Sequence, residues 1–307
     1  MQRIIVEVGG ERLDKFLAER MDCTRSQLKY AEILLNGKCA KSGSVLRAGD
    51  VVECRLQNAE CRTLPEEIPL DVVLEDDYLM IINKPRGMVV HPGAGVKGGT
   101  LLNALMYLAN SEERRANSEC KIERGGIVHR LDKNTAGLMV VAKTATVQAS
   151  LAAMFERHEV KRTYVGIVEG VLTGEGTIDK NIVRDPKRRT LYTVSTTPSP
   201  CGATPSFSKG SSFGGRRAIT HFKVLQNFSK WSLVRFNLET GRTHQIRVHC
   251  KSIGHPIIGD PEYNPSSSIK GLSGQMLESV EIEFVHPMSN TPSACGCHPF
   301  ILKGNII

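Results

Sequence analysis

The chain has 307 residues, 40% of them hydrophobic, and its 40 lysines and arginines exceed its 32 aspartates and glutamates, giving a net charge of +8. This length and composition predict a sizeable core in one large domain, with a small domain beside it. The positive charge favours a polyanionic partner. No run approaches the roughly 20 apolar residues that span a bilayer, and residues 1–10 lack a signal-peptide core. These features exclude a membrane-spanning protein, and we expect a cytoplasmic one with no membrane partner.

The nine cysteines are scattered and odd in number, which is typical of reduced thiols. Cys295, Cys297 and His298 are close enough together to ligate a metal, but no second Cys/His pair at zinc-finger spacing accompanies them. We therefore expect no metal site in this segment.

A first compact unit extends from about residue 11 to residue 56. Leu13, Phe16 and Leu17 recur at helical spacing. Asn36-Gly37 then predicts a two-residue type I′ hairpin turn. The unit is therefore expected to combine short helices with a small sheet.

A second helix is expected to begin at Thr24, where Gln27 completes a capping box, and Arg25 and Lys29 lie one turn apart on the same face. The Arg-Leu-Asp-Lys-Phe-Leu opening and the Asn-Gly-Lys and Ala-Gly-Asp turns resemble the S-four-type RNA-binding module. That resemblance implies RNA contacts for Arg25 and Lys29. The chain is a few residues shorter than the usual pattern before Ile33, which predicts a smaller RNA-binding face. A solvated basic surface without a ligand is the alternative.

Proline and serine content marks the boundaries of the larger domain. Residues 61–69 contain Pro65 and Pro69 and indicate a linker, so we expect an RNA-binding module over residues 1–60 and a second domain over residues 70–307. Residues 196–215 are rich in Ser, Pro and Gly and indicate a flexible insertion.

The larger domain opens with two expected strands, residues 72–74 and 79–82, followed by a turn over residues 83–87. Lys84 and Arg86 lie in this turn and could contact phosphate. An ordinary exposed turn lysine is an equally good interpretation of Lys84.

The centre of the chain carries Asp132 on a loop. The apolar pair Ile127-Val128 leads in and the apolar run 138–142 leads out, and both are predicted to be short buried strands. Arg130 and Lys133 flank Asp132 and would keep its carboxylate ionised. By charge pattern alone, such a segment is usually a solvated turn.

Two further segments carry polar residues on predicted elements. Tyr164 lies in an expected strand, where a half-buried structural tyrosine is the simplest interpretation. An alternating strand over residues 231–238 precedes a helix on which His244, Arg247 and Lys251 share one face. Without further information, that face would be taken as solvated.

Together these segments resemble the motifs of the RluA/RluC/RluD-type pseudouridine synthases. The matching runs are His-Arg-Leu-Asp-Lys-Asn-Thr-Ala-Gly at residues 129–137, the strand around Tyr164, and Thr-Gly-Arg-Thr-His-Gln-Ile-Arg-Val-His at residues 240–249. The resemblance implies an α+β fold, with a mixed, mainly antiparallel bent sheet flanked by helices and a small N-terminal α/β RNA-binding module. The chain departs from the family where Gly274 and Glu278 replace a basic residue and a histidine.

The resemblance also implies roles for individual residues. Asp132 would be the essential carboxylate, Tyr164 would stack on the uracil and move a proton, and Arg247 would pair with Asp132. Arg130 would fill the gap left by an extruded base, and Arg242 would bind backbone phosphate. Whether Asp132 attacks the sugar carbon or acts as a base stays open.

The implied activity is isomerisation of specific uridines to pseudouridine in RNA, with large-subunit ribosomal RNA as the expected substrate and tRNA as the alternative. We expect a monomer that needs no cofactor, because the reaction has no redox step or phosphate donor. A non-catalytic RNA-binding protein and a base-excising glycosidase are the rival functions, and the latter would need a second carboxylate. A metal triad of His129, Asp132 and His249 is disfavoured, because the interleaved arginines would repel a cation.

Overall fold

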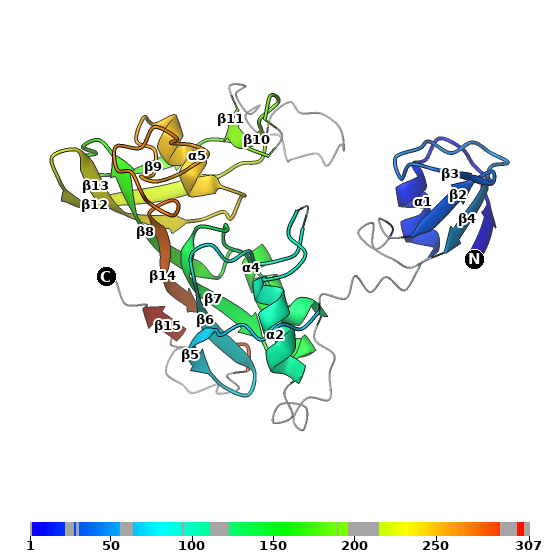
Figure 1. Cartoon of the computed structure of the whole chain (residues 1–307), viewed down its shortest axis with the longest axis horizontal. Helices are drawn as coiled ribbons and strands as arrows, with labels where there is room; N and C mark the ends of the chain where they lie inside the picture. Colours follow the sequence, from blue (N-terminus) through cyan, green and yellow to red (C-terminus); the bar gives the residue numbers. More distant parts are fainter. Residues whose placement is uncertain are drawn as a thin grey trace. The chain divides into compact units, whose positions relative to one another are not determined.

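The computed structural model divides the chain into two compact units, Met1–Leu64 and Pro65–Ile307, and we describe each by itself (Figure 1). The structure describes residues 2–21, 28, 31–55, 64–93, 95–110, 123–188, 190–195, 215–288 and 300–303. Arg25, Lys29, the expected insertion up to residue 214 and the segment from Cys295 to His298 lie outside the described residues.

The first unit is a four-stranded antiparallel sheet with one described helix. The strand order is β1 (Gln2–Ile5), β4 (Val51–Arg55), β2 (Glu32–Leu35) and β3 (Lys38–Cys39), and the helix is α1 (Leu13–Arg20). Leu13, Phe16 and Leu17 are buried, as their helical spacing predicts. They pack in one cluster with Val52 and Cys54 of β4, so a single apolar layer holds the helix on the sheet.

The predicted hairpin turn between β2 and β3 is confirmed. Asn36 and Gly37 have φ values of 52° and 75°, and a type I′ turn requires positive φ at both central residues. The side chain of Asn36 also accepts a hydrogen bond from the backbone nitrogen of Val51, at 2.8 Å, which ties the turn to β4.

The second unit is built on a nine-stranded sheet with the order β5-β6-β7-β14-β8-β13-β12-β9, and β15 pairs with β14. Among the strands that the structure describes, only β7 and β14 pair in parallel, so the sheet is mixed and mainly antiparallel, and the predicted α+β class is confirmed. The strands are β5 (Asp71–Glu75), β6 (Leu79–Lys84), β7 (Ala136–Ala142), β8 (Lys161–Glu169), β9 (Glu175–Asp179), β12 (Ile219–Asn227), β13 (Trp231–Leu238), β14 (Leu277–Phe284) and β15 (Phe300–Lys303).

A separate hairpin and several helices surround this sheet. The hairpin and the helical segments are β10 (Ile182–Arg184), β11 (Tyr192–Val194), α2 (Leu101–Asn110), the short 3₁₀ helix η2 (Glu123–Gly126), α4 (Ala145–Glu156) and α5 (Gln245–Ser252). Among the described residues, none of the helices is both long enough and apolar enough to cross a membrane.

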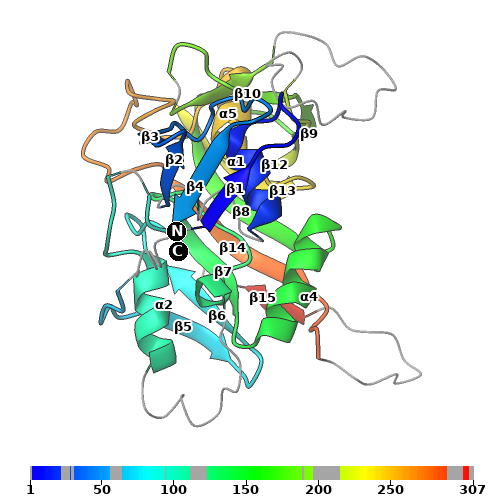
Figure 2. The same ribbon diagram turned by 90° about the vertical axis from the view of Figure 1, so that its right-hand side faces the viewer.

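Both faces of the central strands are buried, because successive side chains of a strand point to opposite faces. Met80 and Ile82 of β6 belong to a core cluster that includes α2 and α5, whereas Leu79 and Ile81 belong to a second cluster that includes α4. Figure 2 shows α2 and α4 on opposite sides of these strands. Full burial of each such side chain stabilises the fold by about 1.5–3 kcal/mol. The apolar runs seen in the sequence therefore become the middle layer of the unit.

The predicted strand at Ile127-Val128 is wrong. Ile127 makes a single antiparallel bridge to Val141 and no longer pairing. The backbone nitrogen of Val140 instead donates to Nε2 of His129, at 3.0 Å. The imidazole of His129 thus satisfies the backbone of β7 where a paired strand at residues 127–128 would have done so. Because residues 127–128 are not held in a strand, the backbone can turn towards Asp132.

Candidate active site

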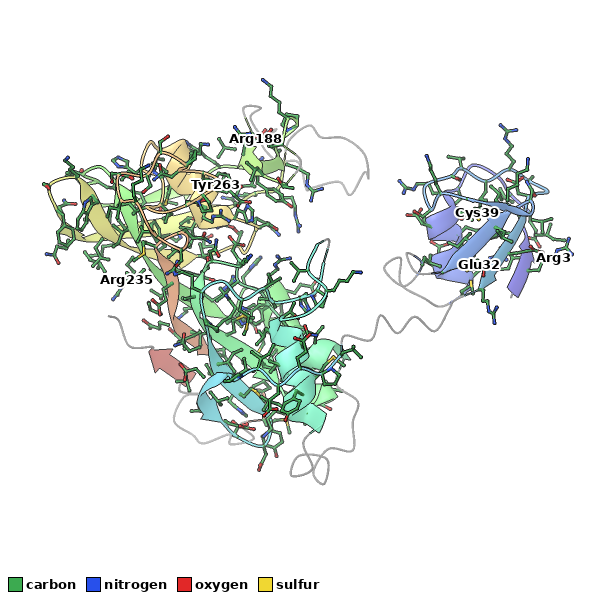
Figure 3. All side chains as sticks on the ribbon, viewed as in Figure 1. Arg3, Glu32, Cys39, Arg188, Arg235 and Tyr263 are labelled. Atoms are coloured by element: carbon green, nitrogen blue, oxygen red, sulfur yellow. The ribbon has the colours of Figure 1, made fainter. Side chains whose placement is uncertain are left out.

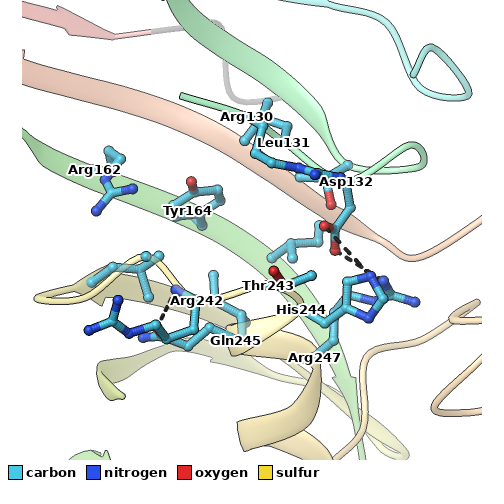
Figure 4. Close-up of a pocket in the computed structure, with 15 residues that line it drawn as sticks. Arg130, Leu131, Asp132, Arg162, Tyr164, Arg242, Thr243, His244, Gln245 and Arg247 are labelled. Carbon is cyan, nitrogen blue, oxygen red and sulfur yellow. Dashed lines mark hydrogen bonds and ion pairs between the residues drawn. The ribbon is translucent and has the colours of Figure 1, made fainter. Parts of the chain in front are cut away.

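Three segments that are far apart in the chain line one pocket. They contribute residues 130–132 and 135, residues 162 and 164 of β8, and residues 238 and 241–247 around the start of α5, and Leu277 completes the lining. Figure 4 shows Tyr164 between Arg162 and Asp132, with Arg242 and His244 on the facing wall. All three polar segments that the sequence singled out therefore meet at one place.

The carboxylate of Asp132 is paired with the guanidinium of Arg247, as the resemblance implied. Nη1 of Arg247 donates to Oδ2 of Asp132 at 3.0 Å. The Arg247 side chain is 3% exposed and that of Asp132 is 17% exposed. Asp132 thus reaches the pocket surface while its counter-ion stays inside the protein.

Two other carboxylates hold Arg247, and the sequence analysis did not include them. Nε and Nη2 of Arg247 donate to the two oxygens of Asp260 at 2.6 and 2.8 Å, and Nη2 also donates to Glu262 at 2.5 Å. Burial acts to lower the pKa of Arg247, but the hydrogen bonds and charge of Asp260, with help from Asp132, raise it overall. The guanidinium is therefore a permanent cation with a fixed orientation.

Hydrogen bonds from other segments hold the loop that carries Asp132. The backbone nitrogen of Thr135 donates to the carbonyl of Asp132 at 3.1 Å, and Nε2 of Gln275 donates to the Thr135 hydroxyl at 3.1 Å. Arg86 donates to the carbonyl of Asn134 at 2.8 Å and also to that of Gln275. A loop fixed at several points is a rigid mount for a reactive side chain.

Lys84 also holds this loop, and the structure contradicts both sequence interpretations of it. Lys84 is 0% exposed, so it is neither a phosphate contact nor an exposed turn lysine. Its ammonium donates to the carbonyls of Pro85, Met88 and Lys133 at 2.8, 3.0 and 3.2 Å. Burial lowers the pKa of Lys84 to about 8, against the attraction of Asp132. Three inward-facing carbonyls, which no local pattern reveals, account for the burial of this cation.

Tyr164 lies on β8 with its ring in the pocket wall. It is 6% exposed and belongs to the main core cluster. Burial raises the pKa of its hydroxyl, and the charge of Asp132 adds to this shift, whereas Arg162 and a hydrogen bond with Ser279 oppose it. The hydroxyl is therefore protonated at neutral pH and can act as a hydrogen-bond donor.

Arg130, Arg162 and Arg242 supply positive charge to the pocket lining. None of the three has an ion pair with another of the described residues, and Nε of Arg242 donates to the carbonyl of Arg217 at 3.1 Å. Unpaired arginines beside a pocket suit the phosphates of a nucleic acid. Arg162 was not predicted from the sequence, although its position two residues before Tyr164 on β8 puts both side chains on one face of the strand.

His249 of the third matching run and His255, which follows α5, have structural partners. His249 contacts the Thr220 hydroxyl at 2.9 Å and the Lys180 carbonyl at 3.1 Å, and Nδ1 of His255 lies 2.8 Å from the Glu169 carbonyl. In the part of the chain that the structure describes, there is no group of three His, Cys, Asp or Glu side chains that could hold a metal ion.

Comparison with known proteins agrees with this geometry. Residues 78–252, which include Asp132, Tyr164 and Arg247, match the protein-family model described as RNA pseudouridylate synthase. The ribosomal large subunit pseudouridine synthase D of Vibrio vulnificus (strain CMCP6) is 38% identical over 301 residues, which cover 91% of this chain and 85% of that protein. The protein of the same name from Escherichia coli (strain K12) is 38% identical over 299 residues, covering 91% of this chain and 84% of its own length.

Solved structures show the same fold. Human RNA pseudouridylate synthase domain containing 4 aligns with a TM-score of 0.56 and 22% identity, covering 77% of this chain and 88% of that one. Human RNA pseudouridylate synthase domain containing 1 aligns with a TM-score of 0.54 and 22% identity, covering 78% of this chain and 93% of that one. On the matched family model and the extent of identity to the bacterial proteins, this chain belongs to the RNA pseudouridylate synthase family.

Proposed function

We propose that this RNA pseudouridine synthase isomerises specific uridines in the ribosomal RNA of the large subunit. The observation that carries the proposal is the Asp132–Arg247 pair in a pocket that also holds Tyr164 and three further arginines. The substrate follows from the bacterial relatives, whose names specify the large ribosomal subunit. A tRNA is the alternative substrate.

The reaction exchanges one bond for another at the same sugar carbon. The bond from C1′ to N1 of uracil breaks, the base turns, and C1′ joins C5, while C5 loses a proton and N1 gains one. Atoms and electrons balance without a redox partner. C1′ becomes electron-poor as the first bond breaks, and a carboxylate can stabilise that charge or attack the carbon, as in glycoside hydrolysis. We assign that role to Asp132.

Arg247 keeps Asp132 ready for this step. A bound RNA would exclude water from the pocket, and desolvation alone favours a neutral carboxylic acid. The guanidinium 3.0 Å away favours the charged form. Because Arg247 holds Oδ2, the carboxylate also keeps one orientation towards the sugar.

The remaining pocket residues would bind the extruded nucleotide. A uridine inside an RNA helix is out of reach, so it must be flipped out at a cost of a few kcal/mol. We propose that Tyr164 stacks on the uracil and moves a proton, that Arg130, whose side chain is exposed beside Asp132, fills the vacated space, and that Arg242 binds backbone phosphate.

We also propose an S-four-like RNA-binding role for the module over residues 1–60, joined by the linker at residues 61–69 to the catalytic domain over residues 70–307. The four-stranded sheet and helix α1 of the first unit suit such a module, and Arg25 and Lys29 are its proposed RNA contacts. A monomer acting in the cytoplasm, away from membranes, completes the proposal.

The test is to map pseudouridine in ribosomal RNA by carbodiimide-dependent primer-extension stops. Cells would carry the wild-type protein, Asp132→Asn, or Asp77→Asn as a matched control, because Asp77 is exposed and lies outside the pocket. Asp132→Asn keeps the shape of the side chain and removes its charge. We expect one or a few stops to disappear only in Asp132→Asn. Unchanged stops, with the variant still bound to RNA, would favour a non-catalytic RNA-binding protein.

A further inference from the structure

His244 lines the pocket beside Asp132 and Arg247. It precedes α5 with a φ of 56°, in the left-handed region. That conformation costs a residue other than glycine roughly 1–2 kcal/mol, and such strain persists only where the surroundings impose it. The rings of Tyr192 and Tyr263 each pack edge-on against the imidazole, with centroids 5.6 Å away. The ring of His244 is therefore held in one position.

Hydrogen bonds determine which ring nitrogen carries the proton. The hydroxyl of Tyr263, which lies beside α5 (Figure 3), accepts from the backbone nitrogen of Tyr192 at 2.9 Å and is 2.8 Å from Nδ1 of His244. Burial raises the pKa of Tyr263, so its hydroxyl keeps a proton to donate. Among the described residues, Nδ1 is the one acceptor within hydrogen-bond distance of this hydroxyl. We therefore assign Nδ1 as the acceptor, which in a neutral imidazole puts the proton on Nε2.

The charges around His244 are compatible with a neutral ring. Burial, the largest effect, lowers the pKa of His244, and the positive charge of Arg247 acts in the same direction. The carboxylates of Asp132, Glu262 and Asp260 oppose this shift without reversing it. At neutral pH, the ring therefore presents an Nε2–H donor to the pocket.

This donor faces the free oxygen of the Asp132 carboxylate. Nε2 of His244 lies 3.9 Å from Oδ1 of Asp132, whereas Oδ2 is bound by Arg247. The gap is too long for a direct hydrogen bond, but an oxygen atom about 2.8 Å from each of the two atoms would fit between them. A hydroxyl group matches this arrangement, because it accepts from Nε2–H and donates to the carboxylate.

We propose that Nε2 of His244 and Oδ1 of Asp132 together bind the 2′-hydroxyl of the target uridine. This inference rests on the proposed function, which places Asp132 at C1′, and the 2′-hydroxyl is on the adjacent carbon. Within an RNA chain the 3′ and 5′ oxygens are esterified, so the 2′-hydroxyl is the free hydroxyl of the ribose. It is also the group by which a protein distinguishes RNA from DNA. His244 is then a substrate-binding residue that selects ribonucleotides and anchors the sugar beside the carboxylate.

The test compares two RNA oligonucleotides of the mapped target sequence, one with uridine and one with 2′-deoxyuridine at the target. Single-turnover rates of pseudouridine formation would be measured with saturating full-length protein, and the ratio of the two rates is the readout. His244→Phe keeps a ring between Tyr192 and Tyr263 but removes both nitrogens. His244→Gln places an amide N–H near the position of Nε2. His221→Phe is the matched control, because His221 contacts Thr177 and Glu239 outside the pocket.

We expect wild type and His221→Phe to prefer uridine by about tenfold, the value of one good hydrogen bond in rate terms. The preference should fall towards unity in His244→Phe and largely return in His244→Gln. If His244→Phe melts like wild type but keeps the full preference, the inference is overturned, because a histidine that only positions Asp132 would slow both substrates equally.

Failure of the proposed function would give a different result. In that case wild type would convert neither oligonucleotide, or Asp132→Asn would convert uridine as fast as wild type. Conversion of uridine that depends on Asp132, with an unchanged ratio in His244→Phe, would overturn this inference alone.

Discussion

Asp260 and Glu262 bind the same guanidinium at similar distances but differ in exposure. Asp260 is 0% exposed and accepts from Arg247 at 2.6 and 2.8 Å, whereas Glu262 is 38% exposed and accepts at 2.5 Å. Changing each to its amide, Asp260→Asn and Glu262→Gln, removes one negative charge with little change in shape. The pair therefore tests whether burial or distance determines the contribution of a carboxylate to this site.

The expected loss is much larger for Asp260. Burial acts to raise the pKa of Asp260, but the hydrogen bonds and charge of Arg247 and two backbone amides lower it overall, so the folded protein depends on the ionised form. Its Oδ1 also accepts from the backbone nitrogens of Glu262 and Tyr263. If the Asn oxygen keeps those bonds and the one from Nη2 of Arg247, its amide N–H₂ takes the place of Oδ2 and faces the Nε–H donor of Arg247.

Breaking a buried ion pair of this kind costs about 3–5 kcal/mol of unfolding free energy. For Glu262, solvent screens the pair, and the expected loss is about 0–1 kcal/mol. Because Arg247 positions Asp132, the rate of pseudouridine formation should fall by at least about tenfold in Asp260→Asn, which corresponds to about 1.4 kcal/mol of activation free energy.

Urea unfolding followed by tryptophan fluorescence would measure both losses. The chain has one tryptophan, and Trp231 lies on β13 of the second unit, so the signal reports that unit alone. Equal losses of unfolding free energy for the two variants, or a loss below about 1 kcal/mol for Asp260→Asn, would refute the reasoning that burial determines how much each carboxylate contributes to stability.

Two further predictions concern stability. Gly137 has a φ of 109°, and a Cβ there would lie 2.2 Å from the Ser279 carbonyl, whereas Gly174 has a φ of 70° and open space. Gly137→Ala and Gly174→Ala should both lose about 1–2 kcal/mol of unfolding free energy, because alanine is strained at positive φ. Gly137→Ala alone should lose a further amount of about 1–3 kcal/mol from overpacking against Ser279. Equal urea midpoints for the two variants would contradict this prediction. Because burial lowers the pKa of Lys84 from 10.5 to about 8, the unfolded chain binds more protons than the folded chain between these pH values. The unfolding free energy of wild type should therefore rise relative to that of Lys84→Met from pH 8 to 10, by at most about 1.4 kcal/mol per pH unit. A difference between the two proteins that does not change with pH would contradict the lowered pKa of Lys84.

Elements governed by local rules were predictable from the sequence. The turn at Asn36-Gly37 and the alternating strand over residues 231–238 were placed correctly, because a two-residue turn and a period of two depend on neighbouring residues alone. The strand predicted at Ile127-Val128 failed because its edge of β7 is met by the side chain of His129. That contact joins positions 129 and 140, and periodicity carries no information about it.

The burial of Lys84 could not be predicted for a similar reason. A lysine in a polar turn is normally exposed, and here the decisive acceptors include the carbonyl of Lys133, 49 positions away. Asp260 and Glu262 were not predicted to belong to the site, although their carboxylates hold Arg247 in place. Residues such as Asp260 position Arg247 through their distance from it in the folded protein and through their burial, and a short sequence motif specifies neither.

The cation that pairs with Asp132 is not one of its neighbours in sequence. Arg130 and Lys133 flank it in sequence and were expected to keep it ionised, yet neither has an ion pair with it among the described residues, and both side chains are exposed. The cation that contacts the carboxylate is Arg247, 115 positions away, and only the family resemblance pointed to that pair. Exposed neighbouring cations are screened by solvent, while Arg247 acts from the interior with its own charge fixed by two other carboxylates. Arg130 has no ion pair with another of the described residues, so its guanidinium is available for the contact with RNA that we propose for it.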